Sequence, residues 1–185
     1  MNKNVKFLTT TALMAAVMCI LGPLSIPIGP VPISLTNLAI YITMYVLDKK
    51  RGTLAFLIYM LIGLAGLPVF SGFAGGPGKL FGPTGGYIIG FLPMAFLIGV
   101  VVDKYWKNPV ICVIAMEAAT WIPYILGSAW LAYQGHMTFP AALAAGVIPF
   151  IIEDLAKMVI SAILGPVLKK RLAFFNNSEK NMAKA

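Results

Sequence analysis

The segment GLPVFSGFAGGPGKLFGPTGGYIIGF, residues 66–91, decides how the rest of the chain is arranged. Glycine recurs along it between aromatic residues, so the segment combines close backbone approach with apolar, stackable faces. Long apolar runs flank it on both sides, which predicts a loop and a helix entrance at a membrane boundary. Two interpretations are open: an ordered loop that packs on itself, or a lid that cradles a ligand. We prefer the lid, because long ordered loops are often functional.

The composition of the whole chain indicates a polytopic membrane protein. Of its 185 residues, 59% are hydrophobic and 11% are charged, and the mean hydropathy is +0.88, which is too apolar for a soluble domain. The net charge of +8 does not indicate a nucleic-acid partner, because no basic groove or aromatic platform accompanies it. Cys19 and Cys112 lie in apolar runs without metal-ligand spacing, so we expect packing roles, no disulfide and no metal.

Apolar runs separated by charged or glycine- and proline-rich turns predict an all-α integral membrane protein. One domain, residues 1–175, contains six transmembrane helices, and a polar cytoplasmic tail without regular structure, residues 176–185, follows it. The first helix is retained rather than cleaved, because no A-x-A site follows it. Prolines 23, 27, 30 and 32 predict an extended connector, and residues 127–140 are expected to form a loop. The expected spans are 6–23, 33–47, 53–67, 85–102, 109–126 and 141–168.

The distribution of basic residues predicts the orientation. If the odd-numbered spans run outward, the outside holds only Lys79, and Lys157 lies within a span. The inside then holds Lys3, Lys6, Lys49, Lys50, Arg51, Lys104, Lys107, Lys169, Lys170, Arg171, Lys180 and Lys184. Positive residues favour the cytoplasmic side, so both termini are predicted to be cytoplasmic and segment 66–91 to lie on the outer face.

Charged side chains in the last span are the leading candidates for a functional site. Glu153 and Asp154 precede Lys157 by four and three residues, so both acids can meet the lysine on one helix face. At about 1.5 Å per residue, Asp154 lies about 22 Å from Lys169 at the inner boundary. That depth is in the outer third of a core about 30 Å thick. Charges there suggest a functional site by default, although a self-neutralising structural pair also fits the pattern.

Two further polar side chains lie within the predicted spans. Asn37 in the second span needs a hydrogen-bonding partner, and a neighbouring helix or a ligand would supply it equally well. Glu117 in the fifth span has no helical partner three or four residues away. We interpret Glu117 as either a helix contact or a weaker site candidate.

The sequence does not predict an enzyme. Gly78-Lys79 is not part of a GxxxxGK[ST] phosphate loop, because residue 73 is Phe73 and residue 80 is Leu80, so the chain is not expected to hydrolyse ATP. His136, the single histidine, falls in a predicted loop and is badly placed for a Ser–His pair. Acidic clusters for metal-dependent lipid chemistry are also missing from the sequence, and no cofactor is expected.

The chain resembles the BioY family, the biotin-specific S components of energy-coupling factor transporters. Segment 66–91 carries the resemblance together with VPISLTNL at 31–38, GSAWLA at 127–132 and PFIIEDLAK at 149–157, and it covers most of the chain. The chain departs from the family pattern in two places. Many members carry Gln and Thr where this chain has Thr36 and Asn37, and Gly where it has Glu153.

The resemblance implies six helices in the bacterial plasma membrane, in contact with lipid, and a biotin pocket near the outer face. Ala12 and Ala16 match the AxxxA motif through which S components meet the transmembrane coupling subunit, and two partner ATPases would hydrolyse ATP. The candidate substrate contacts are Asn37, Phe73, Gly76, Thr84, Gly85, Tyr87, Asp154 and Lys157.

Biotin suits a pocket of this composition. A buried Asp can accept from its ureido N–H groups, a Lys can donate to an oxygen, and aromatic side chains can cover its rings. Which end of biotin contacts Lys157 stays open. The alternative is a self-contained secondary transporter for a small organic solute, with Glu153, Asp154 and Lys157 as a proton relay. Inverted repeats would favour it, and the sequence contains none that we find.

The predicted orientation can be tested with single cysteines in a variant that lacks Cys19 and Cys112. Lys79→Cys is expected to react with an impermeant thiol reagent added to intact cells, whereas Lys50→Cys should react only after permeabilisation. The opposite labelling pattern would place segment 66–91 on the cytoplasmic side and contradict the orientation.

Overall fold

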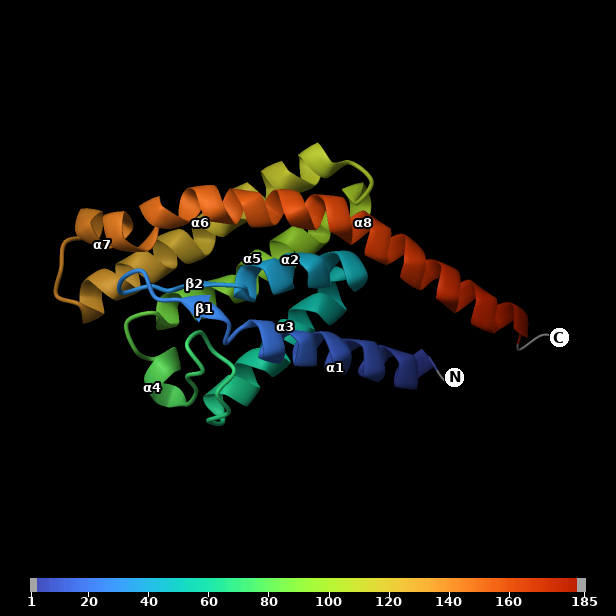
Figure 1. Ribbon diagram of the computed structural model, residues 1–185, viewed down its shortest axis with the longest axis horizontal. Helices are drawn as coiled ribbons and strands as arrows, with labels where there is room; N and C mark the ends of the chain where they lie inside the picture. Colours follow the sequence, from blue (N-terminus) through green and yellow to red (C-terminus); the bar gives the residue numbers. More distant parts are fainter. Residues whose placement is uncertain (1–2, 183–185) are drawn as a thin grey trace.

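The computed structural model describes residues 3–182, and the side chains of residues 5–172. Within this range six long helices pack into one bundle (Figure 1). They are α1 (Lys3–Leu21), α2 (Thr36–Val46), α3 (Lys49–Leu64), α5 (Gly85–Tyr105), α6 (Pro109–Gln134) and α8 (Ile151–Met182). The shorter elements are strands β1 (Ser25–Ile26) and β2 (Ile33–Ser34), helices α4 (Pro77–Leu80) and α7 (Phe139–Gly146), and the 3-10 turn η1 (Ile148–Phe150).

The proline-rich connector is extended, as its sequence predicts. Strands β1 and β2 pair antiparallel, with Ser25 opposite Ser34, and so form a hairpin between α1 and α2. Proline has a fixed φ and no N–H group, which excludes a helix here but allows short strands that have few partners. The hairpin brings Val31 and Ser34 over the end of the bundle that lies away from the termini, where they line a cavity described below.

The prediction that residues 127–140 form a loop is wrong over most of its length. Helix α6 continues to Gln134, because GSAWLAYQ contains no proline that would end it. Tertiary contacts also hold this end of the helix. Trp130 Nε1 donates to the carbonyl of Gly82 at 2.9 Å, and Gln134 Nε2 donates to that of Phe81 at 2.9 Å.

The last predicted span is not one continuous helix. Helix α7 ends at Gly146, the turn η1 follows, and α8 begins only at Ile151. Pro149 explains the break, because its ring disfavours helical geometry at the residue before it and it donates no hydrogen bond. At the other end α8 stays helical to Met182, contrary to the predicted unstructured tail; no proline or glycine follows Pro166. Residues 183–185, with Lys184, lie outside the described range, as do the side chains of Lys3 and Lys180.

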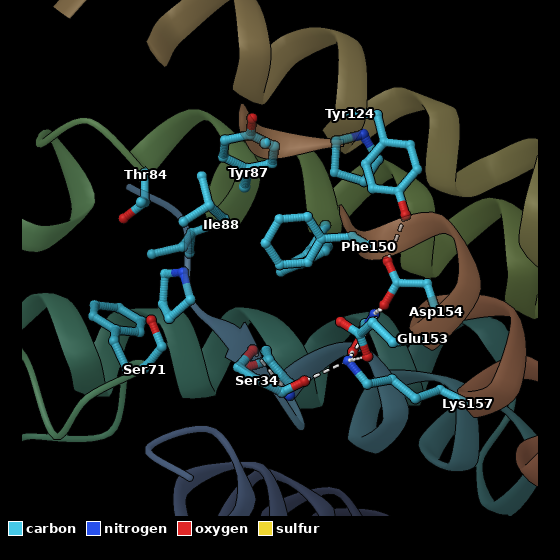
Figure 2. A pocket seen from close by; sticks show the side chains of 18 of the residues that line it. Ser34, Ser71, Thr84, Tyr87, Ile88, Tyr124, Phe150, Glu153, Asp154 and Lys157 are labelled. Atoms are coloured by element: carbon cyan, nitrogen blue, oxygen red, sulfur yellow. Dashed lines mark hydrogen bonds and ion pairs between the residues drawn. The ribbon is translucent and has the colours of Figure 1, made fainter. Parts of the chain in front are cut away.

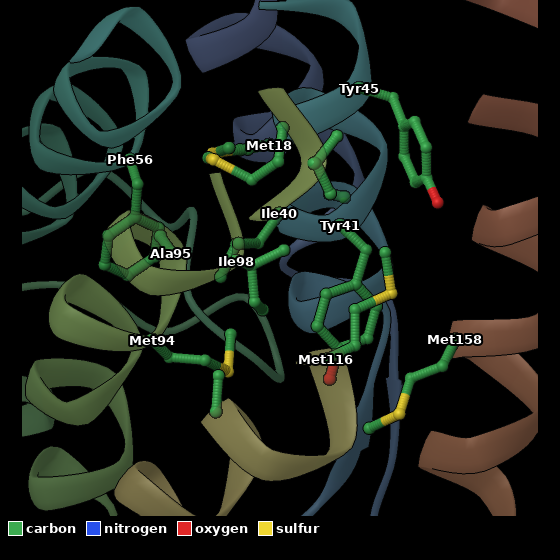
Figure 3. Close-up of a cluster of buried hydrophobic side chains, with 14 of the residues drawn as sticks. Met18, Ile40, Tyr41, Tyr45, Phe56, Met94, Ala95, Ile98, Met116 and Met158 are labelled. Atoms are coloured by element: carbon green, nitrogen blue, oxygen red, sulfur yellow. The ribbon is translucent and has the colours of Figure 1, made fainter. Parts of the chain in front are cut away.

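The core of the bundle is formed mainly by methionine and aromatic side chains (Figure 3). It joins all six long helices, and its most buried members are Met18, Ile40, Tyr41, Met44, Tyr45, Phe56, Met94, Ile98, Met116 and Met158. The outside is apolar as well, since Ile20, Ile114, Ile152 and Ile163 are each more than 60% exposed. An apolar core inside an apolar exterior is the arrangement that a lipid-facing helix bundle requires.

Within the described residues, two helices are long and apolar enough to cross a membrane, namely α5, with a mean hydropathy of 2.1, and α6, with 1.8. Val5–Leu21 and Thr36–Val46 are apolar but shorter. Six crossings therefore stay a prediction. Figure 1 shows the N- and C-terminal ends at one end of the bundle, and the hairpin, α4 and α7 at the other. This arrangement is the one that an even number of crossings needs; which end is cytoplasmic also stays a prediction.

Candidate functional site

A cavity lies at the end of the bundle that carries the hairpin and segment 66–91 (Figure 2). Its empty space, including the open mouth, measures about 670 Å³. Most of its wall is apolar, and charged side chains from α8 gather on one side. It is lined by Val31, Pro32, Ser34, Thr36, Asn37, Tyr59, Phe70, Ser71, Thr84, Tyr87, Ile88, Phe91, Pro123, Tyr124, Gly146, Phe150, Glu153, Asp154 and Lys157.

The ammonium group of Lys157 is the centre of the charged side of the cavity. It is 3.3 Å from Asp154 Oδ1 and 2.5 Å from Glu153 Oε2. It also donates to the Ser34 carbonyl at 2.6 Å and to Asn37 Oδ1 at 3.0 Å. The lysine is only 7% exposed, so these contacts replace the water that a buried ammonium loses.

Asp154 is held by donors from three helices. The Asn37 amide of α2 and Lys157 of α8 both donate to Oδ1, and the Tyr124 hydroxyl of α6 donates to Oδ2 at 2.7 Å. The carboxylate is 4% exposed. Because a carboxylate oxygen accepts more than one hydrogen bond, Oδ2 keeps capacity for a donor from a ligand.

Local sequence places these charges at the cavity. Pro149 delays the start of α8, so Glu153 and Asp154 fall in its first turn, where the helix dipole favours negative charge. One turn later Lys157 lies beneath both acids. The hydroxyls of Ser71 and Thr84 lie across the cavity from this cluster (Figure 2). The cavity therefore has a charged wall on α8 and a neutral polar wall near segment 66–91.

Tyr87 is fixed by two glycines that leave room for its ring. A Cβ atom on Gly127 would lie 2.2 Å from the Tyr87 ring, and one on Gly146 would lie 1.9 Å from its hydroxyl oxygen. The same oxygen is 3.1 Å from Ser128 Oγ. Because α6 and α7 come this close, Tyr87 closes the cavity between them and has little freedom to move.

The structure brings five of the predicted contact residues together and leaves three apart. Those on the cavity wall are Asn37, Thr84, Tyr87, Asp154 and Lys157. Phe73 is 66% exposed, and Gly76 N donates to the carbonyl of Gly63 at 2.7 Å. Gly85 packs on the chain itself, because a Cβ there would lie 1.8 Å from the Leu80 carbonyl oxygen. These three residues do not line the cavity.

Segment 66–91 is ordered, as the first interpretation expects, and it lines the cavity; its role as a lid that cradles a ligand stays a prediction. It packs on itself and on its neighbours, since Phe70 N donates to Ala74 O at 2.9 Å and the Tyr59 hydroxyl donates to Val69 O at 3.0 Å. It also supplies Phe70 and Thr84 to the cavity wall. The segment is thus an ordered loop that forms one side of the pocket.

Sequence reasoning missed the roles of Tyr124 and Ser34. Tyr124 is a polar residue in an apolar span, but nothing local shows that its hydroxyl meets an acid thirty residues later. Ser34 contributes its backbone carbonyl, which no side-chain pattern reveals. Glu117 is half-buried on α6 and does not line the cavity.

Comparison with known proteins finds relatives over nearly the whole chain. The model of the BioY family matches residues 1–174. The chain is 43% identical over 148 residues to the biotin transporter BioY of Thermotoga maritima, a match that covers 80% of this chain and 86% of that protein. It is 34% identical over 175 residues to the biotin transporter BioY2 of Lactococcus lactis subsp. cremoris, covering 95% and 96%.

A solved structure shares the fold. The crystal structure of the S-component for biotin from an ECF-type ABC transporter matches with a TM-score of 0.83 at 34% identity. The match covers 92% of this chain and 95% of that chain. The shared architecture therefore includes the helices that form the cavity.

The packing around Tyr87 predicts the effect of Gly146→Ala. The new methyl group overlaps the Tyr87 oxygen, so we expect the thermal unfolding midpoint to fall, reflecting a loss of about 1–3 kcal/mol from overpacking. Adding Tyr87→Phe removes that oxygen and should restore part of the loss. Gly78→Ala is the matched control, because a Cβ there meets nothing within 4 Å. An unchanged midpoint in Gly146→Ala would show that this contact does not hold Tyr87.

Proposed function

We propose, because this chain belongs to the BioY family, that it is the biotin-binding S component of an ECF-type transporter. It captures biotin in the cavity, and partner subunits power its uptake. The buried pair of Asp154 and Lys157 on the cavity wall is the observation that supports assigning biotin binding to particular residues. A binding subunit makes and breaks no covalent bond, so we assign no catalytic residue.

The cavity offers what each part of biotin needs. Asp154 accepts from a ureido N–H group, since its Oδ2 keeps free acceptor capacity. Lys157 and Asn37 supply donors beside it. The apolar rings and chain suit the space between Phe70 and Phe150, where burial in an apolar wall stabilises binding. Thr84 and Tyr87 belong to the same pocket in this proposal.

We also propose that the bundle crosses the bacterial plasma membrane six times, with both termini and the tail in the cytoplasm. The exposed apolar surface supports a lipid environment. The basic residues at the helix ends support this orientation. The cavity then faces the outside, where biotin is captured.

The coupling subunit is proposed to dock on α1. Ala12 and Ala16 are exposed on this helix, whereas Ala15 and Met18 pack into the bundle. Small exposed residues four apart let a second helix approach closely. Two ATP-binding cassette ATPases complete the transporter, since this chain has no phosphate loop of its own.

Biotin binding tests the roles of Asp154 and Lys157. Asp154→Asn keeps shape and one acceptor oxygen but loses the charge that strengthens hydrogen bonds from N–H donors. Lys157→Met keeps the bulk of the stem but removes the donors. Each variant is expected to lose at least about tenfold in biotin affinity, equivalent to about 1.4 kcal/mol. Isothermal titration calorimetry on the monodisperse fraction gives the affinity per folded molecule.

Glu117→Gln is the matched control, because it changes a half-buried acid on α6 that does not line the cavity. It should bind biotin as the wild type does. If the pair were purely structural, Asp154→Asn and Lys157→Met would be unstable but bind normally once folded. Wild-type affinity in both folded variants would therefore contradict the assignment.

Docking on α1 is tested by Ala12→Leu combined with Ala16→Leu. The bulky side chains should block close helix approach, so we expect lost co-purification with the coupling subunit and unchanged biotin binding. Ala118→Leu with Ala129→Leu, at exposed positions of α6, is the control and should assemble normally. Assembly that survives the α1 changes would show that this face is not the docking surface.

A further inference from the structure

Glu153 has a carboxylate oxygen whose capacity is unused. Its Oε2 contacts Lys157 at 2.5 Å, but its Oε1 is shielded from solvent and has no hydrogen-bond partner in the described part of the chain. The side chain lines the cavity and is 22% exposed. A shielded carboxylate oxygen without a donor is costly, so its position on the wall of a binding cavity points to a donor on the ligand.

The hydrogen bonds of Lys157 show which of its partners can be exchanged. An ammonium group has three N–H donors, yet four acceptors surround this one. Ser34 contributes a backbone carbonyl of the hairpin, and the Asn37 and Asp154 side chains bond each other as well as the lysine. Among the described residues, Lys157 is the only side chain whose N–H groups contact Glu153. Glu153 is therefore the acceptor that Lys157 can release at least cost.

The kinds of group on this wall match one edge of a cyclic urea. Lys157 Nζ is 2.5 Å from Glu153 Oε2 and 3.3 Å from Asp154 Oδ1, so the wall presents two acceptor groups beside one donor group. The edge of a cyclic urea presents N–H, C=O and N–H, which is donor, acceptor and donor. The two patterns are complementary, provided that Lys157 turns one N–H from Glu153 to the carbonyl.

Charge at this wall supports the same orientation. Two carboxyl groups share one ammonium, so the wall has no unpaired positive charge that would attract a further carboxylate. The carboxylate of a ligand is then directed across the cavity, toward the hydroxyls of Ser71 and Thr84 (Figure 2).

We propose that Glu153 is a third polar ligand-binding residue that lies beside Asp154 and Lys157 and exchanges its contact with the lysine for a ureido N–H of the ligand. This inference rests on the proposed function and names the subsite that reads the urea edge. It makes Glu153 a determinant of specificity, because a ligand that lacks the N–H leaves the carboxylate without a donor.

The test combines variants of Glu153 with biotin derivatives that lack one ureido N–H. The ligands are biotin and its two isomers that carry a methyl group on a single ureido nitrogen. The variants are Glu153→Met, which keeps most of the bulk and removes both acceptors, and Glu153→Gln, which keeps one oxygen and removes the charge. Affinities are measured by calorimetry on the monodisperse full chain, with Glu117→Gln as the control.

Both Glu153 variants are expected to lose about tenfold or more in affinity for biotin, since a hydrogen bond to a charged group is lost or weakened. In the wild type both methylated isomers should bind more weakly than biotin. The Glu153→Met variant should bind one of the two isomers nearly as tightly as it binds biotin, because the N–H group that this isomer lacks has no acceptor in the variant. In Glu117→Gln, each methylated isomer should bind more weakly than biotin by the same factor as in the wild type.

Two results would overturn the inference while the proposed function stands. One is wild-type affinity for biotin in both folded Glu153 variants. The other is that each methylated isomer binds more weakly than biotin by the same factor in Glu153→Met as in the wild type. Absence of biotin binding by the wild-type chain would instead contradict the proposed function, and this inference with it.

Discussion

Burial of the Lys157 ammonium is the constraint on which the rest of the site depends. A charge that is 7% exposed in an apolar bundle is unstable unless several acceptors replace its water. The acceptors come from the hairpin at Ser34, from α2 at Asn37 and from α8 itself. These elements are far apart in the sequence, so satisfying one charge fixes the hairpin over the bundle and α2 against α8. The position of the cavity follows from that convergence.

The remaining packing joins the helices in the core and around the cavity. Methionine and aromatic side chains fill the core, which reaches the cavity at Tyr59 and Phe70. Tyr41 and Thr120 join α2 to α6 by a hydrogen bond of 2.8 Å. Near the cavity, α6 is tied to α8 through Tyr124 and Asp154. The charged wall is thus supported on regular helices, which hold a binding geometry more closely than loops do. The opposite wall comes from segment 66–91, whose hydrogen bonds keep it ordered.

Helical periodicity and the backbone restrictions of proline act between residues that are close in the sequence. The sequence therefore predicts the structural features that these local effects determine. The spacing of Glu153, Asp154 and Lys157 predicts their meeting, and the prolines predict the extended connector. The break at Pro149 and the continuation of α6 to Gln134 were missed, because apolar periodicity alone does not distinguish a helix end from a helix that a partner stabilises. The hydrogen bond of Tyr124 depends on the register between α6 and α8, which no local pattern encodes.

Two neighbouring carboxylates have different surroundings, and this difference bears on how the pocket selects its ligand. Asp154 accepts from Asn37, Tyr124 and Lys157, so the orientation of its carboxylate is fixed without a ligand. Glu153 contacts Lys157 through Oε2, and its Oε1 has no hydrogen-bond partner in the part of the chain that the structure describes. A preorganised acceptor lowers the cost of ordering the ligand, whereas an exchangeable acceptor penalises a ligand that brings no donor. Adjacent positions on one helix turn can therefore contribute affinity and selectivity separately, because their partners, rather than their chemistry, differ.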